Sequence, residues 1–175
     1  MKSRMYIRIF LMLIVASMTF GAVAQEFGET EAEMDSLYEV RILMEEIDGV
    51  YIPADLDDAF VELERLSFSS DIEKYKAATE ETVRDKLHFG LGRWMMYNWG
   101  FYMGSRLSHS LKGLGLEHPD DMAKFLLVSW HRHLNEKPLE IEEQVQYYFE
   151  LREQERRDRK GNQEVIHKET RKRKN

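Results

Sequence analysis

The chain has 175 residues, of which 33% are charged; its formal net charge is -7 at pH 7, and it contains no cysteine. Without cysteine there are no disulfide bonds, no thiol catalysis, no cysteine-bound zinc and no iron–sulfur cluster. The charge is uneven, because residues 25–151 carry a net charge of -15. This acidic body argues against nucleic acid as a partner, since phosphate contacts require a positive surface.

The first 24 residues are typical of a secretory signal peptide. Three basic residues precede an unbroken apolar run, and Ala22-Val23-Ala24 supplies small residues at the cleavage positions. The apolar run is shorter than the roughly 20 residues that cross a bilayer. We therefore expect cleavage after Ala24 and a mature protein that is periplasmic or secreted, with no transmembrane span. A lipoprotein anchor is not expected, because no cysteine follows the signal.

The helical period dominates the rest of the chain, and no strong strand pattern with a period of two is present. The first helix is expected over Glu31–Ile47, and Asp48-Gly49, which follows directly, is expected to end it. Asp55 is expected to cap the next helix, which carries a clean apolar stripe. Ser70 and Glu73 fit a capping box at the start of a short helix.

The most apolar helix is expected to begin at Thr79 and to pass through the middle of the domain. Between Leu87 and Trp99 it is apolar on nearly all sides, which is typical of a buried central helix. Gly100 and Gly104 interrupt it, and Ser105 is expected to cap a short helix that follows.

The second half of the chain predicts two more helices and a tail. His118 precedes a helix with Pro119 at its first position, and the acids Asp120 and Asp121 face the N-terminal dipole. A last helix follows, and residues 152–175 then hold ten basic against five acidic residues. Disorder is expected from about Gly161, because no large apolar residue occurs between Glu153 and Glu164 and the chain must leave the core there.

These elements predict an all-α fold. The expected domain, residues 51–151, is a single compact bundle of five to seven helices wrapped around the aromatic segment Leu87–Trp99. Residues 25–50 add an N-terminal helix and linker. Residues 152–175 add a charged, partly disordered C-terminal helical extension.

Aromatic residues are the first candidates for a site. Six of them fall within residues 89–102, enough to line a ligand-binding surface, although aromatics at helical spacing are more often core. Trp99 and Phe101 flank the glycine break, so these two are expected to reach a surface most readily. Asn98 lies in the apolar stripe and needs a polar partner, most simply at the break over residues 100–105; a ligand-binding amide is the alternative.

Charged candidates have both internal and external interpretations. Arg93 and Arg106 can grip a carboxylate or phosphate through two nitrogens, but an acidic body offers internal partners, which we favour. We expect no cofactor. We also expect no metal, because the histidine spacings do not match ligand motifs; a site assembled across helices from His88, His118 and Asp120 is the remaining metal hypothesis.

The order of several short motifs resembles a known family. These motifs are HFGLGRW from His88, NWG from Asn98, GSRL from Gly104 and HPDDM from His118. Together with Ile52-Pro53 they are similar to a bacterial domain of unknown function, a small and mostly helical domain. The resemblance covers about Tyr51–Leu151. It implies a shared fold and a shared polar centre, but no activity.

The leading functional hypothesis is an exported binding module that recognises a protein or a cell-envelope component. The candidate binding residues are His88, Arg93, Asn98, Trp99, Arg106, His118, Asp120 and Asp121. The alternative is an envelope-acting hydrolase or lyase that uses a histidine and an aspartate of this set as acid and base, although a helix cap is the commoner role for Asp120 and Asp121. A structural helper of another protein is a third possibility, and the sequence leaves the oligomeric state open.

Overall fold

The structure is a computed structural model that describes residues 31–172, and the side chains of residues 34–161. The expected signal peptide and its cleavage position after Ala24 lie outside the described residues. The chain divides into two units between Asp35 and Ser36, and the elements discussed below belong to the second unit, apart from the start of the first helix. Among residues 31–172, no helix combines the length and apolarity of a membrane span.

A short hairpin replaces the end of the first expected helix. Helix α2 covers Glu31–Arg41, and strands β1 (Glu46–Ile47) and β2 (Val50–Tyr51) follow as an antiparallel pair. Asp48 and Gly49 form the connection, with φ angles of 53° and 78°. Positive φ at both central residues matches the right-handed twist of a hairpin, and Asp-Gly favours it. The prediction of a helix through Ile47 is therefore wrong beyond Arg41.

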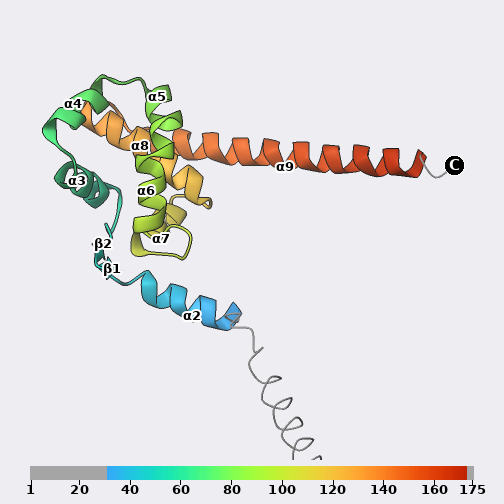
Figure 1. Ribbon diagram of the computed structural model, residues 1–175, viewed down its shortest axis with the longest axis horizontal. Helices are drawn as coiled ribbons and strands as arrows, with labels where there is room; N and C mark the ends of the chain where they lie inside the picture. The colour runs from blue at the N-terminus through green and yellow to red at the C-terminus, as the bar shows by residue number, and fades with distance from the viewer. Residues whose placement is uncertain (1–30, 173–175) are drawn as a thin grey trace, which may run out of the picture. The chain divides into compact units, whose positions relative to one another are not determined.

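The remaining elements are helices, as predicted. They are α3 (Leu56–Leu66), α4 (Ser69–Ala77), α5 (Glu80–Asp85), the 3₁₀ helix η1 (Leu87–Phe89), α6 (Leu91–Asn98), α7 (Arg106–Gly113), α8 (Pro119–Leu134) and α9 (Ile141–Lys172). Within residues 31–172 the fold is thus mostly helical, with eight α-helices and one two-stranded hairpin (Figure 1). The predicted all-α fold class is confirmed.

Local capping signals located several helix starts correctly. The side chains of Asp55, Thr79 and Ser105 each accept a hydrogen bond from the backbone N–H three residues later. Such bonds satisfy donors that a helix start leaves without partners. The capping box predicted at Ser70 is wrong, because the N-cap of α4 is Phe68, two residues earlier, and it provides no side-chain cap.

The centre of the bundle is α8, not the aromatic segment that we expected there. Ten of the 16 residues of α8 are buried, and this helix packs against α3, α4, α5, η1, α6, α7 and α9 (Figure 1). Burying each large apolar side chain of this kind stabilises the fold by about 1.5–3 kcal/mol. The expected central helix is instead broken into α5, η1 and α6, with Gly90 between the last two. The break at Gly90 changes which side chains face inward.

The C-terminal helix is longer than the sequence predicted. We expected disorder from Gly161, whereas α9 is helical to Lys172. The segment after Leu151 is rich in Glu, Gln, Arg and Lys, which lose little side-chain freedom in a helix. Arg152 also pairs with Glu155, and Arg156 with Glu153, each three residues apart along the helix.

Candidate functional site

Three exposed aromatic side chains lie in or next to α6. Phe89 is 72% exposed, Tyr97 is 69% exposed and Tyr102 is 54% exposed. Trp99 and Phe101, which we expected at a surface, are both buried in the core. That prediction is wrong because Trp99 follows the inward face of α6, on which Met95 is also fully buried. The side chains that reach solvent lie on the other face.

The exposed aromatic rings are connected through their neighbours. The ring centres of Tyr97 and Tyr102 are 5.6 Å apart. Burial of the Tyr102 hydroxyl, with the nearby Asp120 and Tyr97, raises the pKa of Tyr102, whereas Arg93 lowers it. Arg93 and Asp120 are thus close enough to Tyr102 to change its pKa, and Arg93 lies one turn before Tyr97 on α6. Phe89 joins the same group through His88, whose ring centre is 5.7 Å away and which bonds to Asp120. We call Phe89, Arg93, Tyr97, Tyr102 and Asp120 the aromatic surface.

His88 and Asp120, two of the predicted site residues, are in direct contact. The His88 Nε2 atom lies 3.0 Å from Asp120 Oδ1, and this bond ties η1 to the first turn of α8. The other ring nitrogen, Nδ1, is buried without a hydrogen-bond partner in the described structure. A Cβ atom on Gly92 would lie 2.9 Å from this Nδ1, so glycine at this position makes room for the imidazole. Neither nitrogen of His88 is free to meet an outside molecule.

Arg93 and Arg106 do not share a role. Arg93 is exposed and forms no ion pair with any described side chain, so the internal pairing predicted for it is not observed. Arg106 does have internal partners. Its Nε donates to the Ile52 carbonyl at 2.6 Å, and its guanidinium lies 3.9 Å from Asp58 and 3.7 Å from Glu45. Arg106 thus anchors α7 to the segment that follows the hairpin, which gives it a structural role.

Asn98 is satisfied within its own helix. Its Nδ2 donates to the carbonyl oxygen of Trp94, one turn earlier, at 2.8 Å. The prediction of a partner at the glycine break is therefore wrong. The amide is only partly buried, and a carbonyl of the preceding turn lies within its reach.

Asp121 points away from His88 and pairs with α9. Its side chain is 3% exposed, and its two oxygens accept hydrogen bonds of 2.7 and 2.6 Å from Arg152. His118 is exposed at the start of α8 and, together with Asp121, Phe149 and Arg152, lines a pocket of about 140 Å³. Arg152 was missed by the sequence reasoning. The only signal for it was the contrast between an acidic body and a basic tail.

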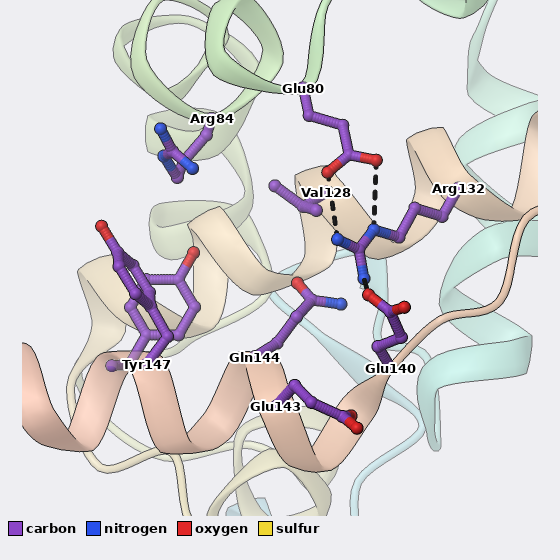
Figure 2. Close-up of a pocket in the computed structure, with 9 residues that line it drawn as sticks. Glu80, Arg84, Val128, Arg132, Glu140, Glu143, Gln144 and Tyr147 are labelled. Carbon is purple, nitrogen blue, oxygen red and sulfur yellow. Dashed lines mark hydrogen bonds and ion pairs between the residues drawn. The ribbon is translucent and has the colours of Figure 1, made fainter.

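A second pocket, of about 170 Å³, lies between α5, α8 and α9 (Figure 2). Arg132 dominates one side of it, donating to both carboxylate oxygens of Glu80 at 3.2 and 3.1 Å and to Glu140 at 2.8 Å. These bonds lower the pKa of Glu80. None of the predicted site residues lines this pocket. Its lining residues come from positions up to 68 apart in the chain, so no local motif revealed it.

Groups suited to metal binding are not assembled at either place. Within residues 34–161, no three histidine or acidic side chains are arranged to hold a metal ion. The hypothetical ligand set is divided, because His88 bonds to Asp120 whereas His118 lines the pocket beside Asp121.

The comparison with known families agrees with the resemblance inferred from the motifs. Residues 52–134 match a family described as Domain of unknown function (DUF6794). The match begins directly after β2 and ends with α8, so it includes the aromatic surface and omits α2, the hairpin and α9. No curated protein and no solved structure matches the chain. Residues 52–134 of this chain are therefore a DUF6794 domain.

Proposed function

We propose that this protein is an exported binding module that recognises a protein or a cell-envelope component through the aromatic surface. The observation that carries the proposal is the exposure of Phe89, Tyr97 and Tyr102, of which the two tyrosine rings lie 5.6 Å apart. Exposed apolar groups that form a contiguous patch often mark interaction sites, whereas single exposed ones are ordinary.

The core does not need these three rings. Trp99, Phe101 and Trp130 are buried in it, and the exposed rings lie on its outer side. Covering about 100 Å² of each exposed ring would contribute roughly 2.5 kcal/mol per ring before the costs of association. Tyrosine and arginine are also enriched where binding free energy concentrates in protein interfaces, and Arg93 lies one turn before Tyr97 on α6.

The aromatic surface is tested by removing its two tyrosines. We expect the Tyr97→Ala/Tyr102→Ala variant to lose most of its retention on isolated cell-envelope fractions, because both rings would lie at the centre of the contact. Phe68→Ala is the matched control, since Phe68 is 79% exposed but lies before α4, outside the aromatic surface. Circular dichroism checks that all variants are folded. Equal retention of the double variant and the wild type would contradict the proposed surface.

Export is a separate part of the proposal and has its own test. It is supported by the signal-type pattern of residues 1–24. Expression of the full chain in a bacterial host should yield a mature protein that begins at Gln25 and fractionates with the periplasm or medium. Mass spectrometry of the purified protein measures the N-terminus. An intact chain found only in the cytoplasm would contradict export.

One contact supports the alternative of a hydrolase or lyase, but a substrate has no direct access to the imidazole in that contact. The His88–Asp120 pair brings an imidazole and a carboxylate together at 3.0 Å, as acid–base chemistry requires. However, one nitrogen of His88 is engaged by Asp120 and the other is buried against Gly92. A substrate would have to displace Asp120 before it met the imidazole. The geometry therefore favours binding over catalysis by this pair.

A further inference from the structure

The pocket between α5, α8 and α9 contains a buried acceptor that has no donor. Gln144 is 8% exposed, and its Nε2 donates to Ser129 Oγ at 3.1 Å and to the Leu139 carbonyl at 2.7 Å. These two bonds fix the orientation of the amide. Its oxygen, Oε1, has no hydrogen-bond partner in the described structure. A buried carbonyl oxygen without a donor is unfavourable, so a missing partner has to be sought.

The unpartnered oxygen is turned toward the pocket, although the atom itself is covered by the pocket wall. Figure 2 shows the Gln144 amide nitrogen turned toward Arg132 and the oxygen turned toward Val128, below Arg84. Val128 and Arg84 both line the pocket, which is open to solvent. An N–H group of a bound molecule is therefore the donor that this position suits.

Two donors without a full set of acceptors lie in the same pocket. Arg84 donates from Nε to Asp85 at 3.0 Å, but its two terminal nitrogens form no hydrogen bond with any described group. The Tyr148 hydroxyl likewise has no described partner. Burial raises the pKa of Tyr148, while the nearby Arg84 lowers it, and the net shift is upward. The hydroxyl therefore keeps its proton at neutral pH and can donate beside the guanidinium.

Arg132, the second arginine of the pocket, is already neutralised, whereas the pocket's Glu143 forms no ion pair with any described side chain. Arg132 is bound to Glu80 and Glu140, and it also donates to the Leu139 carbonyl at 2.9 Å. Arg84 is paired with Asp85 through Nε alone, so its two terminal nitrogens are the cationic donors left for an incoming anion. The side chain of Arg84 is 32% exposed, so a ligand in the pocket can reach its guanidinium.

We propose that this pocket binds an α-amino carboxylate, meaning an N–H group next to a carboxylate, as in a free amino acid or the last residue of a peptide. The carboxylate accepts from Arg84 and Tyr148, and the N–H group donates to Gln144 Oε1. The volume of about 170 Å³ suits a single small residue, since sites for larger ligands measure about 300–1,000 Å³. This site does not depend on the aromatic surface.

Three small probes separate the two sources of this chemistry. N-acetyl-L-alanine presents the amide N–H and carboxylate of a peptide end, L-alanine presents the free amino acid, and L-alaninamide lacks the carboxylate. Calorimetric titration of the full chain should show saturable binding of one or both of the first two and none of L-alaninamide. Stronger binding of N-acetyl-L-alanine would assign the site to a peptide end, and stronger binding of L-alanine to a free amino acid.

Two variants test the residues that carry the proposal. Arg84→Met should weaken the carboxylate probes about tenfold or more, because it removes a charge-assisted donor. Gln144→Leu should do the same, and Gln146→Leu, an exposed position on the same helix, is the matched control with unchanged affinity. Because the Arg84 side chain is partly exposed, Arg84→Met should remain folded, so a loss of binding in this variant reports on the pocket and not on unfolding. No saturation by any probe up to about 10 mM, equal binding of L-alaninamide, or unchanged affinity in Arg84→Met would overturn the proposal.

Discussion

Replacing Arg152 with methionine should destabilise the fold far more than a charge change on a terminal helix normally does. Arg152 lies on α9, outside the family match, yet it holds the carboxylate of Asp121 through two short hydrogen bonds. Asp121 is almost fully buried at the start of the central helix. Without Arg152, this buried carboxylate has no positive partner.

The size of the effect follows from the burial of the two partners. Breaking a buried ion pair from one side costs about 3–5 kcal/mol. Arg152 is 27% exposed and borders a pocket, so water can partly replace it, and we expect a loss of about 2–3 kcal/mol. Replacing both partners, as Asp121→Leu/Arg152→Met, should stay within about 1 kcal/mol of the wild type, because no charge is then left unpaired.

The assay is urea unfolding at pH 7, followed by the fluorescence of the buried Trp99 and Trp130. Arg156→Met is the matched control on the same helix. Its partner Glu153 and Arg156 itself are 28% and 59% exposed, so its loss should cost less than about 1 kcal/mol. If Arg152→Met were no more destabilising than Arg156→Met, the buried pair would not stabilise the fold, and the attachment of α9 at this point would be refuted.

Two further predictions concern α2 and the acid response. Gly104 has a φ of 87°, and a Cβ atom there would overlap the Tyr38 ring of α2. Gly104→Ala should therefore increase amide hydrogen exchange in α2 and destabilise the fold by about 1–2 kcal/mol through left-handed strain. In a Tyr38→Ala background only the strain should remain, and an unchanged exchange of α2 in Gly104→Ala would refute the overlap. The hydrogen bonds from Arg132 lower the pKa of Glu80 in the folded protein below its ordinary value of 4.5. Ionised Glu80 therefore increases the free energy of unfolding above pH 4.5, and this stabilisation is lost as the pH falls through the folded pKa. Glu80→Gln should therefore lose less stability than the wild type between about pH 5 and pH 3, measured by urea unfolding, and parallel curves for the two proteins would contradict this.

Local features of the fold were predictable from the sequence. The helix starts at Asp55, Thr79 and Ser105 were found correctly, because a cap involves only residues within one turn of each other. The family resemblance was also found from short motifs, and the match over residues 52–134 confirms it. Asp48-Gly49 ends the first helix in the sequence pattern, and in the structure it connects the two strands of a hairpin.

The candidate site was only partly predictable. Arg93 and Asp120 are predictable from the sequence as candidates and belong to the aromatic surface, whereas the candidate His88 is buried and bonds to Asp120. Trp99 and Phe101, which the sequence places at a surface, are buried, whereas Tyr97, for which the sequence predicts no surface position, is exposed. Which face of a helix turns inward depends on where the helix begins and on what packs against it, and neither is visible in a list of apolar residues.

The sequence by itself determined that this protein is helical, where several of its helices begin and which family its central domain belongs to, because these properties depend on short-range patterns. Only the tertiary structure decided that α8 forms the centre, that Arg152 meets Asp121, and that Gln144 and Arg84 share a pocket. Each of these contacts joins residues at least 31 positions apart or on different helices. Packing of several helices at once selects such contacts, and no local pattern encodes them.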